Sequence, residues 1–182
     1  MPQTFPDEKR VRALIAAALE EDTAAGDVTV AYLGVGSRRV HAHLLAGESG
    51  VLAGIEVVRM TFDERDASVR FDRRAQDGKR VRPGDLVAVV TGPAAAVLSA
   101  ERVALNFLQH LSGVATITAR FVASVQGKAT SILDTRKTVP LMRELERYAV
   151  RVGGGRNHRF NLGDMILIKE NHIASAGGVA AA

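Results

Sequence analysis

The sequence predicts an α/β protein, in which a region of helices and an open sheet is followed by the start of a parallel α/β region. Three observations predict this class. Residues 7–21 carry apolar side chains at helical spacing, residues 28–92 contain short β-rich runs between turns, and residues 131–169 have the pattern strand, helix, loop and strand. The 182 residues suffice for one large domain or two modest ones with a hydrophobic core.

Composition narrows the classes of function. No run approaches the roughly 18 apolar residues that a membrane span needs, and the N-terminus lacks the apolar segment of a secretory signal. We therefore expect a cytoplasmic protein that does not bind membranes. The absence of cysteine excludes disulfides and cysteine nucleophiles. A net charge of +4 permits anionic ligands, whereas the low aromatic content (4%) argues against nucleic-acid binding.

One helix and four short strands are predicted in the first half of the chain. The helix covers residues 7–21 and opens after Pro6 and Asp7. Residues 76–85, QDGKRVRPGD, form a compact pair of turns. The strands are rich in β-forming residues and are separated by glycine and proline turns; they are Val40–Ala46, Gly50–Gly54, Ser68–Arg73 and Leu86–Val90.

A long apolar helix follows and is predicted to run from Ser99 to about Val125. Ser99 is placed as its N-cap, and Glu101 as an acidic residue near the positive end of the helix dipole. Gly113 inside the helix costs stability unless something packs closely there. Apolar side chains cover most of the circumference, which predicts burial on several sides or a subunit interface. They are Leu105, Phe107, Leu108, Leu111, Val114, Ile117 and Phe121.

The pattern after Gly127 changes to that of a parallel α/β region. Ser131–Asp134 is predicted as a short buried strand, a helix is predicted from Pro140 to Val150, and Met165–Lys169 is predicted as a second strand. Gly153–Gly155 lacks the trailing Lys-Ser/Thr and the spacing of a phosphate loop. Close backbone packing or a tight turn is therefore the favoured interpretation of these glycines.

Cationic residues follow three predicted strand ends or loops. Active sites of α/β folds gather at the carboxyl ends of strands, so the clusters are expected to face one pocket. Arginine binds a carboxylate or phosphate through a planar fork, and lysine acts as a mobile point charge. Such a pocket suits an anion with several negative groups. The candidate residues are Arg136, Lys137, His158, Arg159 and Lys169.

Simpler interpretations of these residues are kept open. The cations could form surface salt bridges with Asp134, Glu144 and Glu146, and a lone His158 is more often structural than catalytic. His41 and His43 alternate on a predicted strand, which places both on one exposed face. We predict no metal ligands in the chain, since it contains no HExxH motif and no clustered carboxylate pair.

Several long motifs occur in order along nearly the whole chain. They are EDTAAGDVT (Glu21–Thr29), GVLAGIEV (Gly50–Val57), VRPGD (Val81–Asp85), ERVALNFLQHLSGVAT (Glu101–Thr116), DTRKTVP (Asp134–Pro140), YAVRVGGGRNHRFNLGD (Tyr148–Asp164) and IKENHI (Ile168–Ile173). With these motifs the chain resembles the quinolinate phosphoribosyltransferase family. The resemblance implies two domains: an open sheet-and-helix domain ending in the long helix, residues 1–115, and the first part of an incomplete α/β barrel, residues 116–182.

The resemblance implies a pentosyltransferase of NAD biosynthesis. It would transfer phosphoribose from phosphoribosyl pyrophosphate to quinolinate with decarboxylation, giving nicotinate mononucleotide, pyrophosphate and carbon dioxide, with Mg²⁺ as cofactor. By motif, Arg136, His158, Arg159 and Lys169 resemble the quinolinate pocket, and Lys137 resembles a contact to quinolinate or the donor. Lys137 and Lys169 are the candidate catalytic residues. Arg102 resembles an arginine that reaches the neighbouring subunit's pocket, which implies a homodimer.

Three alternatives accompany this hypothesis. The first is an inactive, truncated remnant that binds only quinolinate or a partner chain. The second is a related phosphoribosyltransferase with another anionic acceptor. The third is a biotinyl or lipoyl carrier, suggested by DGKRVRPGD (Asp77–Asp85) but opposed by the lack of a clear modified-lysine hairpin tip.

The family's acidic residues for Mg²⁺ and the donor, and its glycine-rich loops for the 5′-phosphate, are expected to lie beyond Ala182. A barrel that stops after two or three strands leaves a parallel edge uncovered. We therefore predict that residues 1–182 alone aggregate readily and show no turnover. The measurement is quinolinate-dependent release of pyrophosphate by the purified chain, and robust release would contradict the prediction.

Overall fold

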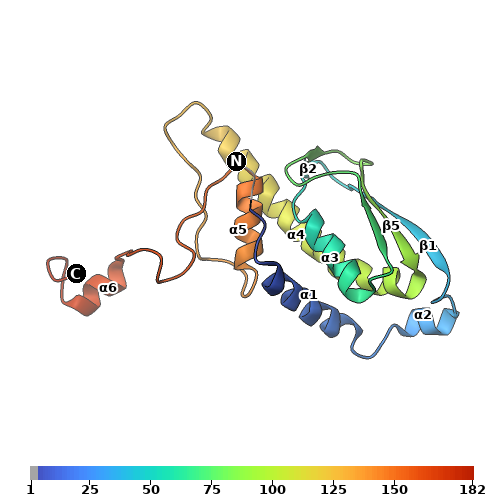
Figure 1. The fold of residues 1–182 in the computed structure, drawn as a ribbon. Helices are drawn as coiled ribbons and strands as arrows, with labels where there is room; N and C mark the ends of the chain where they lie inside the picture. The colour runs from blue at the N-terminus through green and yellow to red at the C-terminus, as the bar shows by residue number, and fades with distance from the viewer. Residues whose placement is uncertain (1–3) are drawn as a thin grey trace.

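The computed structural model describes residues 4–182, and it has the mixed helix-and-strand fold that the sequence predicts (Figure 1). Its two sheets are open, and no closed barrel forms within the described residues. The elements, in chain order, are α1 (Glu8–Thr23), α2 (Val28–Leu33), β1 (Arg39–Leu45), β2 (Gly50–Val51), α3 (Ile55–Arg65), β3 (Arg70–Arg73), β4 (Arg80–Val81), β5 (Leu86–Pro93), α4 (Ala94–Ser124), α5 (Arg143–Val152) and α6 (Glu170–Ala176).

The larger sheet is antiparallel, with the strand order β1-β5-β3, and β2 and β4 form a separate pair. Helices α3 and α4 pack together and contact the strands, so the core lies between them and one face of the sheet (Figure 1). His41 and His43 are exposed on β1, which confirms their predicted place on one open face. His41 Nδ1 lies 3.0 Å from Thr91 Oγ1 on β5.

Helix α4 is the central element, and its length and burial confirm the sequence prediction. Leu111 and Ala115 are fully buried along its inner side. On its other side, Leu98, Ile117 and Phe121 are 46%, 49% and 57% exposed, so residues 4–182 leave that side partly uncovered. A side chain at Gly113 would meet nothing within 4 Å, so no close contact offsets the cost of this glycine.

The predicted start of this helix is wrong. Helix α4 begins at Ala94, directly after β5, because Pro93 precedes a run of three alanines, which favour helix. Ser99 is therefore inside the helix, where its Oγ donates to Ala95 O at 2.6 Å and accepts from Arg65 Nε at 2.7 Å. Glu101 lies too far from the first turn to act on the helix dipole.

Two helices, α2 and α3, occur where only strands and turns were predicted. Asp27 caps α2 by accepting from Val30 N at 2.9 Å. Helix α3 begins with β-branched residues that locally favour a strand, and no side chain next to its start caps it. Its cap comes from Asp77, whose carboxylate accepts from the N–H groups of Gly54 (2.9 Å) and Ile55 (3.0 Å). This distant cap could not be read from local sequence.

Asp77 also joins the sheet region to α5. Its carboxylate accepts a 2.7 Å hydrogen bond from the hydroxyl of Tyr148, whose ring packs edge-on against Phe5. Tyr148 is buried, and burial raises the pKa of its phenol well above the ordinary value, with the neighbouring Asp77 acting in the same direction. The protonated phenol therefore belongs to the native state.

The C-terminal elements differ from the prediction in three places. Ser131–Asp134 forms no strand but a single parallel bridge, Leu133 to Arg156. Helix α5 begins at Arg143 rather than Pro140, because Leu141 has a left-handed φ of 67° that no helix accepts. Met165–Lys169 forms no strand, since it has no ladder partner and its side chains are exposed.

The glycines at 153–155 are a packing element, as the sequence favoured. A Cβ at Gly153 would lie 2.4 Å from Ala115 O and 2.7 Å from Thr118 Cβ, both on α4. A Cβ at Gly155 would lie 2.9 Å from Thr118 Cγ2. The loop after α5 therefore sits against α4 at backbone distance.

Within residues 4–182 no helix is long and apolar enough to cross a membrane. The predicted domain boundary between residues 115 and 116 falls inside the continuous helix α4 and stays a prediction.

We expect Tyr148→Phe to lower the free energy of unfolding by about 1–2 kcal/mol at pH 8, because Asp77 loses a buried donor. The raised pKa makes this contribution complete below pH 10 and progressively lost above it, as the unfolded phenol ionises first. The difference between wild type and variant should therefore shrink between pH 8 and pH 11 in urea unfolding. A difference independent of pH would contradict the role of the phenol.

We expect Gly153→Ala to lower the free energy of unfolding by about 1–3 kcal/mol, because the added methyl group overlaps the backbone of α4. Gly113→Ala is the matched control: it adds the same group in open space, and alanine favours the helix by about 0.5–1 kcal/mol. Urea midpoints of both variants give the comparison. Equal midpoints would show that the loop is not held against the helix.

Candidate anion-binding site

Two loops lie side by side at the parallel bridge between Leu133 and Arg156. The first loop comprises residues 134–138, and the second comprises residues 156–160. Arg156 N donates to Ile132 O at 2.9 Å, and Asp134 N donates to Arg156 O at 3.0 Å. Paired parallel segments run in the same direction, so both loops leave the bridge at the same end. The structure thus places Arg136 and Lys137 on the same side of the bridge as His158 and Arg159.

The carboxylate of Asp134 joins the two loops directly. Its side chain is 5% exposed and accepts hydrogen bonds from His158 N at 2.7 Å and Asn157 Nδ2 at 2.6 Å. It also forms a salt bridge of 3.3 Å with Arg147 on α5. Asp134 is therefore a structural acceptor, with its oxygens occupied by the chain's own donors.

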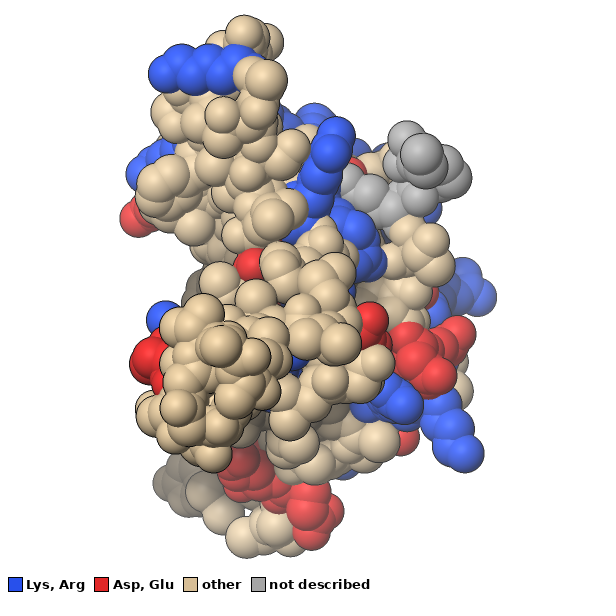
Figure 2. All heavy atoms as spheres, turned by 90° about the vertical axis from the view of Figure 1, so that its left-hand side faces the viewer, with Lys and Arg blue, Asp and Glu red and all other residues tan. Residues whose placement is uncertain are grey.

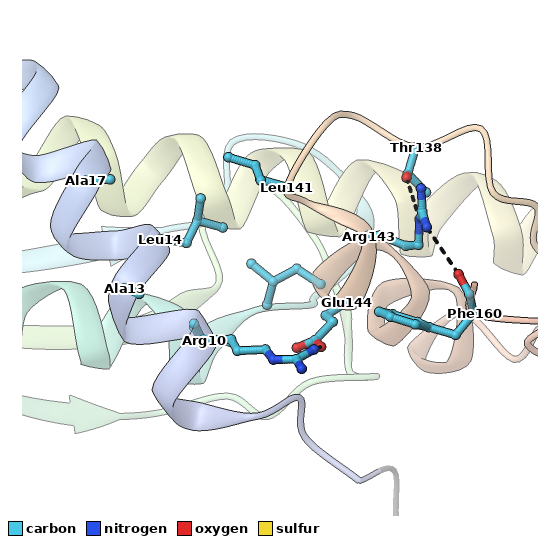
Figure 3. A pocket seen from close by; sticks show the side chains of 11 residues that line it. Arg10, Ala13, Leu14, Ala17, Thr138, Leu141, Arg143, Glu144 and Phe160 are labelled. Carbon is cyan, nitrogen blue, oxygen red and sulfur yellow. Dashed lines mark hydrogen bonds and ion pairs between the residues drawn. The ribbon is translucent and has the colours of Figure 1, made fainter. Parts of the chain in front are cut away.

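Helix α5 holds the second loop through hydrogen bonds from two arginines one turn apart, Arg143 and Arg147. Arg147 donates to His158 O at 2.8 Å and Arg159 O at 3.1 Å. Arg143 donates to Phe160 O at 3.2 Å and to Thr138 Oγ1 at 3.3 Å, which links it to both loops (Figure 3). Sequence analysis missed both residues, although their i,i+4 spacing places them on one helix face.

The predicted cations are not neutralised by carboxylates. Within residues 4–182, no ion pair involves Arg136, Lys137, Arg159 or Lys169. The carboxylates offered as their partners are taken elsewhere: Asp134 pairs with Arg147, Glu144 with Arg10, and Glu146 with His110. The surface salt-bridge interpretation is therefore wrong for these cations.

Arg159 is buried, and Arg136 is half-buried. Arg136 Nε is buried without a hydrogen-bond partner, a costly state for a charged group. Arg159 is 8% exposed, and its Nη1 donates to Met165 O at 2.9 Å. His158 Nδ1 accepts from Arg159 N at 2.7 Å, which leaves Nε2 to carry the proton of the neutral ring. These contacts orient the His158 ring and the Arg159 fork.

Lys169 does not lie beside the two loops that carry the other four predicted residues. It is exposed and precedes α6, where its N–H donates to His172 Nδ1 at 2.9 Å. The segment containing it extends away from the other helices in Figure 1. Figure 2 views the molecule from this side, and the surface nearest the viewer carries few charged atoms, with Lys and Arg lying around it. The contribution of Lys169 to the pocket stays a prediction.

Arg102 lies on α4 in a different place. It lines a cavity of about 500 Å³ together with Glu21, Asp22, His110 and Val139. The lining of this cavity contains none of the four grouped cations. Its predicted contact with a neighbouring subunit stays a prediction.

A more apolar cavity of about 550 Å³ adjoins the loops between α1 and the start of α5 (Figure 3). Its lining includes Leu14, Thr138, Leu141 and Phe160 but none of the predicted site residues. Its two arginines are engaged within the chain, Arg10 with Glu144 and Arg143 with Thr138 Oγ1 and Phe160 O, so we assign no anion to this cavity.

Comparisons with known proteins bear on the family to which the chain belongs. Residues 27–112 match the model of the quinolinate phosphoribosyl transferase N-terminal domain, and residues 114–182 match that of its C-terminal domain. A probable nicotinate-nucleotide pyrophosphorylase (carboxylating) of Bacillus subtilis is 43% identical over 87% of this chain and 55% of its own length. The Mycobacterium leprae nicotinate-nucleotide pyrophosphorylase (carboxylating) is 42% identical over 92% of this chain and 60% of its own length.

Solved structures share the fold. NadC from Streptococcus pyogenes has 44% sequence identity and a TM-score of 0.91, over 97% of this chain and 62% of that chain. The nicotinate-nucleotide pyrophosphorylase of Francisella tularensis has 37% identity and a TM-score of 0.90, over 98% and 63%. The chain thus spans about half the length of the curated relatives it matches. Both family domains occur in order along one shared fold, and the chain belongs to the quinolinate phosphoribosyl transferase family.

Proposed function

We propose that this chain carries the acceptor-binding part of an enzyme that transfers phosphoribose from phosphoribosyl pyrophosphate to quinolinate with decarboxylation. The observation that supports this most is the pair of adjacent loops bearing Arg136 and Arg159, which no carboxylate neutralises. Neither a remnant that only binds a ligand nor a carrier domain has an observation in its favour. The family assignment opposes the carrier in particular.

Quinolinate fits the charges of this site. It carries two adjacent carboxylates beside a ring nitrogen, and a carboxylate accepts two parallel N–H bonds from an arginine fork. The buried Arg136 Nε lacks such an acceptor. Because this Nε is enclosed, a ligand carboxylate would meet the part of the half-buried Arg136 side chain that stays accessible, while Arg159 and His158 from the second loop would bind the neighbouring carboxylate. Another anionic acceptor would have to present a similar pair of negative groups.

The residues of this chain would act by binding and orientation. The quinolinate nitrogen attacks the anomeric carbon while the bond to pyrophosphate breaks, and loss of carbon dioxide then leaves an electron pair on the ring carbon beside the cationic nitrogen. Fixed cations in a dry pocket hold these charges without solvent reorganisation. Lys137, exposed beside Arg136, is placed to contact quinolinate or the donor. Lys169 would join if its segment folded against the loops.

The family resemblance is the only ground for proposing magnesium as a cofactor. Within residues 4–182, no group of three or more His, Asp or Glu side chains is arranged to hold a metal ion. The carboxylate nearest the cations, Asp134, is filled by donors of the chain itself. The described residues do not fit a magnesium site, and no step of the reaction is assigned to the metal here.

A homodimer and a cytoplasmic location complete the proposal. The apolar side chains on the open side of α4, Leu98, Ile117 and Phe121, support a second copy that covers them. Arg102 lies on the same helix and lines a cavity that Val139 also lines, and its reach into a partner's pocket is part of this proposal. The lack of cysteine is compatible with the reducing cytoplasm.

We expect quinolinate to raise the melting temperature of the chain, because a ligand that binds only the native state stabilises it. Arg136→Ala and Arg159→Ala should each weaken the affinity by about tenfold or more, since each removes a charged hydrogen-bond partner worth about 1.5–3 kcal/mol. Arg74→Ala, which removes an exposed arginine paired with Asp72, is the control for charge. Calorimetric affinities that are equal in all four proteins would contradict the proposed site.

We expect the chain to sediment as a dimer and Phe121→Arg to shift it to monomer, because a charge is then buried in the apolar contact. Tyr32→Arg is the matched control, since Tyr32 is 90% exposed and belongs to α2, not to α4. A wild-type monomer, or a dimer that tolerates Phe121→Arg, would contradict this interface.

A further inference from the structure

We infer that Asp134 and Arg147 are positioning residues, which set the spacing between the two substrate-binding loops and thereby the selectivity for a ligand with two carboxylates. The inference rests on the proposed function, because the loops must bind the acceptor. The two residues and Asn157 form what is called here the loop clamp. None of the three is among the predicted substrate-binding residues, and their side chains are engaged with the chain itself.

The loop clamp holds the backbone of one residue, His158, at both its N–H and its C=O. Asp134 accepts from His158 N at 2.7 Å, while Arg147 donates to His158 O at 2.8 Å and to Arg159 O at 3.1 Å. The backbone N–H and C=O of His158 are thus both held. The directions in which the His158 and Arg159 side chains leave the backbone follow from that fixed geometry.

The same carboxylate fixes the other loop. Asp134 lies two residues before Arg136, and its own N–H is bonded to Arg156 O at 3.0 Å. Any movement of the second loop relative to Asp134 therefore changes the separation of Arg136 from Arg159. A small error in position has a large effect when two groups must be bound at once, because both must meet their partners in a single pose.

Burial indicates that this arrangement serves geometry more than stability. The Asp134 and Arg147 side chains are 5% and 11% exposed. Removing two charges from water costs free energy that their attraction only partly returns, and apolar residues of similar size often stabilise a fold equally well. Apolar residues could not hold three backbone atoms at hydrogen-bond distance. The planar fork of arginine reaches two consecutive carbonyls, which the single ammonium of lysine cannot do in the same way.

The decisive variant is Arg147→Lys, which keeps the charge and loses the fork. Arg74→Lys, at an exposed arginine paired with Asp72, is its matched control. Affinities for quinolinate and for nicotinate, which has the same ring and one carboxylate, are measured by calorimetry. We expect Arg147→Lys to weaken quinolinate binding about tenfold and nicotinate binding much less, so that the ratio of the two affinities falls. Asp134→Asn, which keeps one acceptor for His158 N, should fall between wild type and Asp134→Ala.

An unchanged ratio in Arg147→Lys and Asp134→Ala, with both proteins folded, would overturn the inference. A purely structural role would reduce the folded fraction but would leave the ratio of affinities of the folded molecules as it is. If wild type binds no quinolinate, the proposed function fails. The role of the loop clamp in positioning the two loops can then still be tested by hydrogen exchange, which needs no ligand.

Hydrogen exchange followed by mass spectrometry reports on the loops directly. In Arg147→Lys we expect faster exchange in residues 134–138 and 156–160, with α1 and α3 as protected as in wild type. Arg74→Lys should leave both loops unchanged. Unaltered exchange in the two loops, or acceleration spread evenly over the whole chain, would show that Arg147 supports the fold generally and would overturn the inference.

Discussion

Close approach to helix α4 constrains the parts of this molecule that matter for function. Leu111 of α4 lies so near Gly54 that a Cβ there would come within 2.7 Å, and Gly153 on the opposite segment approaches Ala115 O even more closely. The N-terminus of α3 and the loop after α5 therefore both pack against α4 so closely that neither Gly54 nor Gly153 has room for a side chain. Since α5 in turn holds the second cationic loop through Arg147, the site inherits its position from this packing.

Much of the N-terminal fold could be predicted because the signals are local. Apolar spacing gave α1, and β-rich runs between turns gave β1, β3 and β5 within a few residues. The errors arose where distant groups decide. Helix α3 is capped by Asp77 from another segment, and Met165–Lys169 has the composition of a strand without a neighbour to pair with. A strand exists only through its ladder, which a single segment cannot reveal.

The candidate site was predictable to the level of two loops. Their cationic residues follow segments that pair in parallel, and the bridge at Leu133 brings them together as expected for strand ends. The supporting residues could not be identified from sequence, because Asp134 was considered only as a surface salt-bridge partner and no motif marked Arg147. Their importance appears only when the buried carboxylate is seen to accept from His158 N. Lys169 and Arg102 remain assigned by motif.

The unbroken course of α4 has a geometric consequence for assembly. Arg102 and Ala115 are separated by 13 residues of one continuous helix, which corresponds to about 20 Å at 1.5 Å per residue. The helix therefore fixes the distance between Arg102 and Ala115, where the loop that contains Gly153 packs against α4. A second subunit that contacts both Arg102 and the segment around Ala115 must have contact sites separated by the same distance. An insertion of one residue between them would rotate one end of α4 relative to the other by about 100°.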